Sequence, residues 1–132
     1  MIDFNLDSSS GVAPYLQLVH QVQRALRLGL LEEGDRLPTV KQVVVRVAIN
    51  PNTVAKAYRE LEHRGLVAAR PGIGTFVIKT LSDASLAAHR PLRRELERWL
   101  AKARGAGLDE ESIEALFRDT VQSTTEQGIA SA

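Results

Sequence analysis

Asn50-Pro51-Asn52-Thr53-Val54 is the stretch that decides the fold of this 132-residue chain. Asparagine is a favoured N-cap, because its side-chain oxygen accepts a hydrogen bond from a free amide of the first helical turn. Proline suits the first helical position, where its missing N–H would have no partner. The stretch therefore predicts a helix that begins at Pro51 and runs to about Arg64, and Gly65 is typical of a left-handed C-terminal cap.

The predicted helix of residues 51–64 has two chemically different faces. At about 100° per residue, the face expected to be buried consists of Val54, Ala57, Tyr58 and Leu61. The opposite face is entirely hydrogen-bonding or cationic, and it consists of Asn52, Lys56, Arg59 and His63, with Thr53 on its flank. Such side chains reach base edges and phosphates from the major groove of DNA, and the first turns of such a helix usually read the bases. We therefore expect base-edge or near-base contacts from Asn52, Thr53 and Lys56, and a backbone contact from Arg59.

A short hairpin is predicted directly after this helix. Two extended runs, residues 66–70 and 75–79, are joined by Pro71-Gly72-Ile73-Gly74, which indicates a four-residue loop. Gly72 and Gly74 remove Cβ atoms, so that the backbone can approach a phosphate or a minor-groove wall, although a plain turn also favours glycine. Arg70 at the base of the loop is expected to contact a phosphate or the minor groove. Phe76 and Ile78 are expected to face the core.

Two helices are predicted before the decisive stretch. Residues 1–13 lack periodicity and indicate an arm, whereas Pro14 begins a helix that ends near Gly29 or Leu30 and has an apolar stripe of Tyr15, Leu18, Val19, Val22 and Leu26. Thr39 is a plausible cap for a short helix through Val47. The run Val43-Val44-Val45 disfavours a helix by propensity alone, so this prediction rests on the tight connection to Pro51.

Charge is concentrated in the middle of the chain. Residues 36–79 hold eight basic and two acidic residues, a formal charge of +6, whereas residues 81–132 have a formal charge of −2. The middle of the chain thus suits a polyanionic partner. The absence of cysteine excludes disulfides and thiolate metal sites, and no signal peptide or apolar run of membrane-spanning length is evident. We expect a cytoplasmic protein associated with the nucleoid.

The C-terminal third indicates two amphipathic helices. Leu92, Leu96, Trp99, Leu100 and Ala103 share one face of the first, which ends at Gly105 and Gly107, while Asp109 caps the second, whose apolar face includes Ile113, Leu116 and Phe117. Two helices this short cannot cover their own apolar side chains. A second copy of the chain is the simplest cover, and the alternative is that the segment folds back on its own N-terminal domain. The dimerisation residues are then Leu92, Leu96, Trp99, Leu100, Ile113, Leu116 and Phe117.

Several of these motifs together resemble one protein family. Leu37-Pro38-Thr39-Val40-Lys41-Gln42, residues 50–61, Gly65-Leu66-Val67 and Gly74-Thr75-Phe76-Val77 closely resemble the winged helix-turn-helix of GntR-type bacterial transcription regulators, and Tyr15-Leu16-Gln17 with the short C-terminal helices resembles the small YtrA-type branch. The resemblance covers roughly residues 12–120. It implies a dimeric regulator, typically a repressor, of a palindromic operator. It further implies DNA contacts from Thr39, Lys41, Asn52, Thr53, Lys56, Arg70 and Gly72.

Two residues depart from the family pattern. Lys41 stands where arginine is usual and lacks the planar fork for a bidentate contact. Ala48 stands where glycine is usual, and a left-handed alanine costs roughly 1 kcal/mol. Genes of the branch often lie beside ABC-transporter genes, which is only a hint about the genes regulated here.

The expected architecture is α+β and mostly helical, with a winged helix-turn-helix followed by a two-helix segment. The expected boundaries are an N-terminal arm at 1–13, a DNA-binding domain at 14–80, a helical dimerisation segment at 81–122 and a disordered tail at 123–132. An enzyme is disfavoured, because His20, His63 and His89 lack metal-ligand spacing and no nucleophile motif is present; we expect no catalytic residue, metal or cofactor. A protein-interaction module is disfavoured by the polar outer face. A small-molecule effector near Trp99, and the choice between repressor and activator, stay open.

Overall fold

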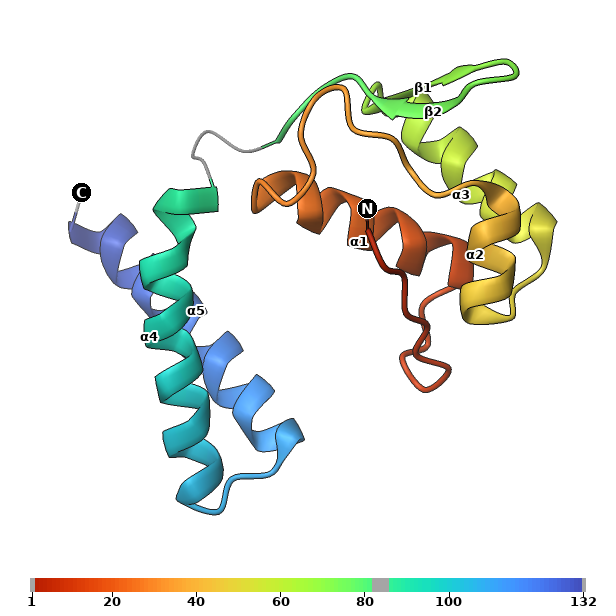
Figure 1. The fold of residues 1–132 in the computed structure, drawn as a ribbon. Helices are drawn as coiled ribbons and strands as arrows, with labels where there is room; N and C mark the ends of the chain where they lie inside the picture. The colour runs from red at the N-terminus through yellow and green to blue at the C-terminus, as the bar shows by residue number, and fades with distance from the viewer. Residues whose placement is uncertain (1, 82–85, 132) are drawn as a thin grey trace. The chain divides into compact units, whose positions relative to one another are not determined.

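The computed structural model describes residues 2–81 and 86–131, and these form five helices and a two-stranded hairpin. The helices are α1 (Pro14–Arg27), α2 (Val40–Val47), α3 (Pro51–His63), α4 (Leu86–Gly105) and α5 (Glu110–Ser131), and the strands are β1 (Val67–Arg70) and β2 (Gly74–Val77) (Figure 1). Contacts divide the chain into two compact units, Met1–His89 and Arg90–Ala132, so the division falls inside α4. The α+β, mostly helical architecture is confirmed.

Helices α1, α2 and α3 enclose the core of the N-terminal unit. The predicted stripe of α1 is buried at Leu18, Val19, Val22 and Leu26, while Tyr15 is half-buried. From α3, the four predicted residues Val54, Ala57, Tyr58 and Leu61 are all buried against it. The amphipathic pattern of both helices thus predicted the core correctly.

The caps explain where α2 and α3 begin. Thr39 accepts a hydrogen bond from the amide of Gln42, and the Gln42 side chain accepts one from the amide of Thr39, which is a complete capping box. The Asn50 side chain accepts from the amide of Asn52 at 2.8 Å, with Pro51 in the first turn. The caps thus fix the direction in which α3 leaves the turn.

The valine run of α2 is helical despite its weak propensity. Val43 is buried, Val44 is half-buried and Val45 is exposed, which is the graded burial of a helix face rather than the alternation of a strand. Packing of α2 against α3 overrides the weak helix propensity of these valines, as the helical prediction assumed.

Ala48 ends α2 in a left-handed conformation, with φ 51° and ψ 50°. We expect Ala48→Gly to raise the free energy of unfolding by about 0.5–1 kcal/mol, because glycine removes the steric cost of this conformation, although it adds freedom to the unfolded chain. Urea denaturation followed by circular dichroism measures the change. The matched control is Ala55→Gly inside α3, which should lower the same free energy by about 1 kcal/mol. A destabilised Ala48→Gly would contradict the strain assigned to this turn.

The N-terminal arm has no helix or strand, yet it is attached to α1. Phe4 is fully buried in the core. The Gln21 side chain exchanges hydrogen bonds with the backbone of Asn5, and the Gln17 side chain does so with the backbone of Asp7. The sequence analysis missed this attachment, although Ile2, Phe4 and Leu6 alternate with polar residues, and all three lie in or against the core.

The hairpin differs in detail from its prediction. Arg70 pairs with Gly74, so the loop comprises the three residues 71–73 rather than four. The prediction that Phe76 and Ile78 face the core is wrong: Val77 and its partner Val67 are buried, Phe76 is half-buried and Ile78 is 44% exposed. Side chains alternate along a strand, so burial of Val77 turns both of its neighbours away from the core.

A third segment pairs with the hairpin and anchors it. Arg36 forms an antiparallel bridge with Phe76, and the amide of Leu37 donates to the carbonyl of Thr75 at 2.9 Å. The amide of Val77 donates to the carbonyl of Asp35 at 2.8 Å. The base of the hairpin is therefore held by the chain that leads into α2, and only its tip is free of this pairing.

Helices α4 and α5 form a helical hairpin in the C-terminal unit. Ala103 and Ile113 are buried between them, Asp109 caps α5 by accepting from the amide of Ser112 at 2.7 Å, and Arg104 pairs with Glu110 at 2.9 Å. The hydroxyl of Ser112, and then its amide, lower the pKa of the Asp109 carboxyl. Helix α5 continues through Gly128 to Ser131, where a disordered tail was expected from residue 123.

Candidate nucleic-acid interface

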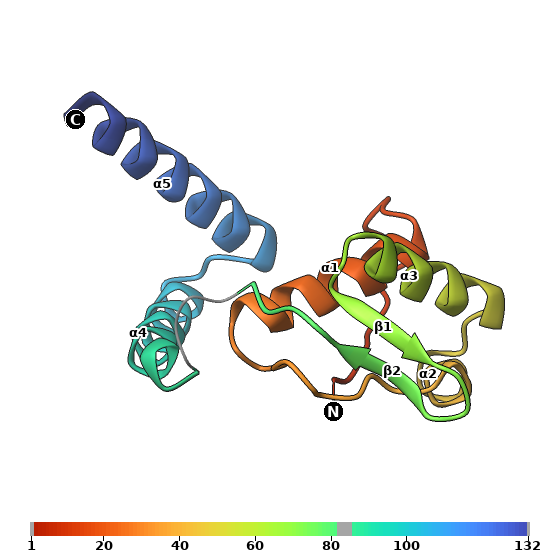
Figure 2. The same cartoon turned by 90° about the horizontal axis from the view of Figure 1, so that it is seen from above.

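The polar face of α3 is exposed as its helical period predicts. Asn52, Lys56, Arg59 and His63 are exposed, Thr53 is half-buried, and the opposite face is buried. In Figures 1 and 2 the α2–α3 turn and the tip of the hairpin both lie at the end of the N-terminal unit away from the C-terminus of α1. The exposed start of α3 and the hairpin, which we call the wing, therefore occupy the same end of this unit.

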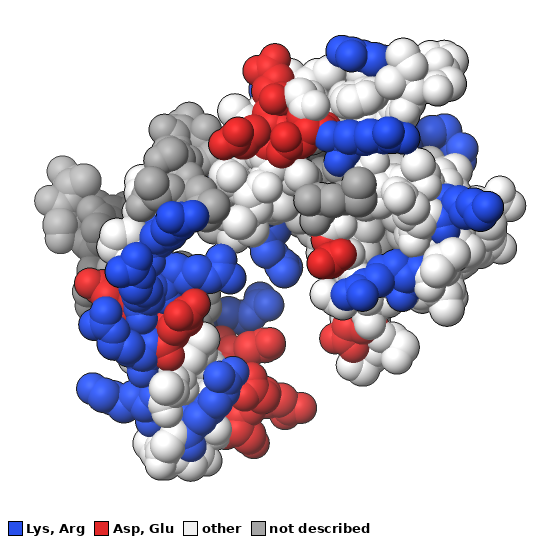
Figure 3. Space-filling view, in the orientation of Figure 1, with Lys and Arg blue, Asp and Glu red and all other residues white. Residues whose placement is uncertain are grey.

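Arg and Lys side chains recur over this end of the unit. Lys41 and Arg46 of α2, Lys56 and Arg59 of α3, and Arg70 of the wing are all exposed. In Figure 3 positive side chains appear along the side that carries the wing, α3 and α2. The two acidic residues of α3 have partners within the protein: Glu60 pairs with Arg64 at 2.8 Å, and Glu62 accepts a hydrogen bond from the amide of Ala69 at 3.2 Å. The exposed end is thus suited to a polyanion.

Lys56 has a partner that the sequence did not predict. Its ammonium lies 4.0 Å from the centre of the Tyr15 ring, at the start of α1. A cation over an aromatic face is held by the ring quadrupole, and the worth of this contact at an exposed site is about 0.5–1 kcal/mol. The contact keeps Lys56 close to the start of α1.

Tyr58 holds α3 against the segment before α2. Its hydroxyl donates to the carbonyl of Pro38 at 2.5 Å inside the core, and burial raises the pKa of the phenol above its usual value. The residue therefore fixes the position of α3 relative to Thr39, the N-cap of α2, and Lys41, which were both assigned to the interface.

We expect Tyr58→Phe to lower the free energy of unfolding by about 1–2 kcal/mol, because the buried Pro38 carbonyl loses its partner. Because the raised pKa keeps the phenol protonated in the folded state, the stabilisation is present below pH 10 and is lost as pH rises above the unfolded pKa of about 10. The difference between the two proteins should therefore shrink between pH 7 and pH 11, measured by urea denaturation. Tyr15→Phe, at a half-buried ring, is the control and should change stability by less than about 0.5 kcal/mol.

The wing carries its two assigned residues at the surface. Arg70 is exposed, with its guanidinium carbon 4.9 Å from the centre of the Phe76 ring, and Gly72 has φ 74° in the turn closed by the amide of Ile73 and the carbonyl of Arg70. Arg36, for which the sequence predicted no specific contact, lies beside Gly74 at the base of the wing. The only sequence signal for Arg36 was its place in the basic middle segment.

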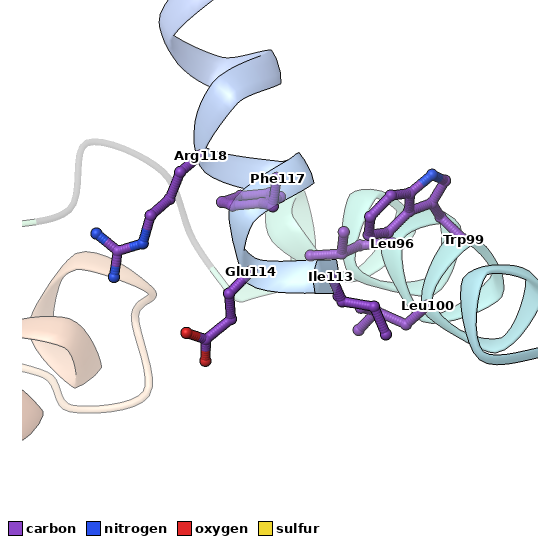
Figure 4. A pocket seen from close by; sticks show the side chains of 7 residues that line it. All are labelled: Leu96, Trp99, Leu100, Ile113, Glu114, Phe117 and Arg118. Atoms are coloured by element: carbon purple, nitrogen blue, oxygen red, sulfur yellow. The ribbon is translucent and has the colours of Figure 1, made fainter. Parts of the chain in front are cut away.

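Five of the seven predicted dimerisation residues line an apolar groove in the C-terminal unit, and Leu92 and Leu116 lie outside it. A hollow of about 430 Å³ is lined by Leu96, Trp99, Leu100, Ile113, Glu114, Phe117 and Arg118. Figure 4 shows the apolar side chains of α4 beside Ile113 and Phe117 of α5. Ile113 is buried and Trp99 and Leu100 are half-buried, whereas Leu92, Leu96, Leu116 and Phe117 are more than 40% exposed.

Among the described residues, none of the helices combines the length and the apolar character that a membrane span requires.

The family described as "Bacterial regulatory proteins, gntR family" matches residues 14–77, the span from the start of α1 to the end of the wing. A transcriptional regulator of Bacillus subtilis, YhcF, is 33% identical over 100 residues, which cover 75% of this chain and 82% of the relative. The chain belongs to the gntR family. Its members are regulators of transcription, and the helix-turn-helix and wing described above are the family's DNA-binding domain.

Two further relatives match over more of the fold. The transcriptional repressor YtrA of Bacillus subtilis is 28% identical over 115 residues, covering 86% of this chain and 88% of the repressor. The solved structure of YtrA from Sulfolobus acidocaldarius, a GntR-family transcription factor, superposes with a TM-score of 0.55 at 25% identity, covering 76% of this chain and 99% of the other. Like these small regulators of the YtrA kind, this gntR-family chain has a winged helix-turn-helix followed by C-terminal helices.

Proposed function

We propose that this gntR-family protein is a homodimeric transcription regulator that binds a palindromic DNA operator and acts as a repressor. Helix α3 enters the major groove, Asn52, Thr53 and Lys56 lie at or near base edges, and Arg59 contacts the backbone. Thr39, the N-cap of α2, and Lys41 in its first turn contact the DNA beside them, and Arg70 and Gly72 bring the wing to the DNA backbone or the minor groove. The repressor role is supported by the name of the related Bacillus subtilis YtrA.

The observation that carries the proposal is the outward polar face of α3. Three of its exposed side chains, Asn52, Lys56 and Arg59, combine amide and cationic groups, and Asn52 lies in the first turn, from which such helices usually read bases. The opposite face of α3 is buried in the core, so the polar face is the one that α3 can present to DNA. A purely protein-binding face would instead need apolar anchors, and this face has none.

The dimeric state is supported by the exposed apolar side chains of α4 and α5. Each large side chain gains about 1.5–3 kcal/mol when it is fully covered. Leu96, Leu116 and Phe117 are incompletely covered within their own unit. A second copy that covered them would also bring two α3 helices to one duplex, and half-sites about 34 Å apart would match one turn of DNA.

Binding to duplexes of random sequence, followed by fluorescence anisotropy, tests the proposal without knowledge of the operator. We expect binding at micromolar protein in low salt, and a steep loss of affinity as salt rises, because released counterions drive the association. Single-stranded DNA of the same length is the control and should bind with a smaller salt dependence. No binding to any duplex at low salt would refute the proposed function.

A further inference from the structure

The base of the wing holds a shallow pocket, which we call the wing-root notch. It encloses about 410 Å³ and is lined by Arg36, Thr39 and residues 69–75. Arg36 comes from the segment that pairs with β2, whereas Arg70 comes from the end of β1. Two arginines from separate segments therefore line one pocket, and the pairing of residues 35–37 with β2 fixes the two segments relative to each other.

The side chain of Arg36 packs against Gly74, at a position where a Cβ atom would clash with it. Gly74 has φ 146°, and a Cβ atom at this position would lie 2.8 Å from Nε of Arg36. Such a distance is too short for unbonded carbon and nitrogen atoms, so the arginine occupies space that only glycine provides. Within the part of the chain that the structure describes, Arg36 has no acidic partner.

Arg70 is oriented by the ring of Phe76. The guanidinium carbon lies 4.9 Å from the ring centre. A guanidinium stacked on a ring still presents its in-plane N–H donors to a ligand, which is the geometry that matches a phosphate or carboxylate. The ring of Phe76, which was expected in the core, thus lies where it contacts the Arg70 guanidinium.

The residues that line the notch include no aspartate or glutamate. The hydroxyl of Thr39 accepts the amide of Gln42 at 3.1 Å as the cap of α2, so its own proton is free to be donated. The notch thus combines two cations and a hydroxyl donor without a competing acid. A tetrahedral oxyanion fits this set of donors, because each guanidinium can give two N–H groups to it.

We propose that the wing-root notch binds one phosphate of the DNA backbone, with Arg36 and Arg70 as its two ligands and Phe76 as the residue that positions Arg70. The proposal rests on the proposed function and adds Arg36 and Phe76 to the interface. It assigns the base of the wing, not only its tip, to DNA. Gly74 is then required for the approach of Arg36 rather than for the approach of the backbone to DNA.

The salt dependence of duplex binding tests the role of Arg36. Loss of one phosphate contact lowers the slope of log affinity against log salt by about 0.9, so Arg36→Gln should lower it by about 2 for a bound dimer. The control is Arg27→Gln, which removes the same charge from the exposed last residue of α1, outside the notch. The control should leave the slope within about 0.5 of wild type.

A double-mutant cycle tests Phe76. Arg70→Gln should weaken duplex binding, and Phe76→Leu should weaken it less. If Phe76 acts through Arg70, the double variant should bind no more weakly than Arg70→Gln alone. Additive losses would remove Phe76 from the proposal, and circular dichroism at the binding temperature confirms that each variant is folded.

The outcomes separate this proposal from the proposed function. No duplex binding by the wild-type protein refutes the function itself. Normal wild-type binding with equal slopes for Arg36→Gln and Arg27→Gln refutes the notch alone. Inorganic phosphate, compared with chloride at equal ionic strength, distinguishes the source of the anion: a larger thermal stabilisation of wild type than of Arg36→Gln, with unchanged duplex slopes, would assign the notch to free phosphate and overturn the DNA assignment.

Discussion

Asn52→Ala is expected to reduce affinity for a specific operator by roughly 5- to 150-fold per half-site and to change affinity for random duplex by less than about 2-fold. An asparagine amide that pairs with a base edge is worth about 1–3 kcal/mol of discrimination, whereas binding to random sequence depends on phosphates. Alanine is a better helix former than asparagine, so the variant keeps α3 folded. The measurement is a pair of anisotropy titrations, one with an enriched operator and one with a scrambled duplex of the same composition.

His63→Ala is the matched control for Asn52. His63 is exposed on the same face of α3 but lies in its last turn, away from the end that reads bases. Its replacement should leave the ratio of specific to random affinity unchanged within about 2-fold. An equal loss on both duplexes for Asn52→Ala would make Asn52 a backbone contact. A larger loss of discrimination for His63→Ala would mean that the other end of α3 faces the bases.

Phe117→Asp and Leu96→Asp are each expected to convert the proposed dimer to monomers and to reduce operator affinity sharply. A dimer contains two copies of each substitution, and each copy removes about 2 kcal/mol of apolar burial, so that the dissociation constant rises about 1000-fold. Both side chains are exposed within their own chain, so the substitutions spare the fold of the monomer. Light scattering and analytical ultracentrifugation measure the oligomeric state.

Leu30→Asp is the control for these two variants. Leu30 is 49% exposed, nearly the same as Phe117 at 47%, but it lies in the N-terminal unit just after α1. It should remain dimeric and bind DNA as the wild type does. A stable dimer from both Phe117→Asp and Leu96→Asp would mean that the groove between α4 and α5 is not the interface. An apolar effector would then be the remaining candidate for the groove.

The fold was predictable where caps and helical periods agreed. Asn50 and Pro51 started α3, its apolar positions were buried as a set, and Gly65 took the left-handed conformation with φ 74°. The faces of Phe76 and Ile78 were not predictable, because a four-residue strand is too short to fix its register by pattern. That register depends on the burial of Val67 and Val77 and on the bridge to Arg36, which is a contact between distant segments.

The site was predictable as a surface but not as a set of contacts. The sequence placed Asn52, Lys56 and Arg59 on an exposed face, and they are exposed. It could not show that the Lys56 ammonium lies over Tyr15, or that Arg36 approaches Gly74. Both contacts join residues that are distant in sequence, and no local period encodes them.

Selection of bound sequences from a random duplex library tests the account most directly, because it asks whether α3 reads DNA. The wild-type protein should enrich an inverted repeat whose half-sites are centred about 10 base pairs, or one turn, apart. Asn52→Ala should relax the preference at one position in each half-site. Retention of duplex without enrichment of any sequence would contradict the assignment of α3 as the helix that reads the operator. An identical motif from the two proteins would remove Asn52 from the base contacts.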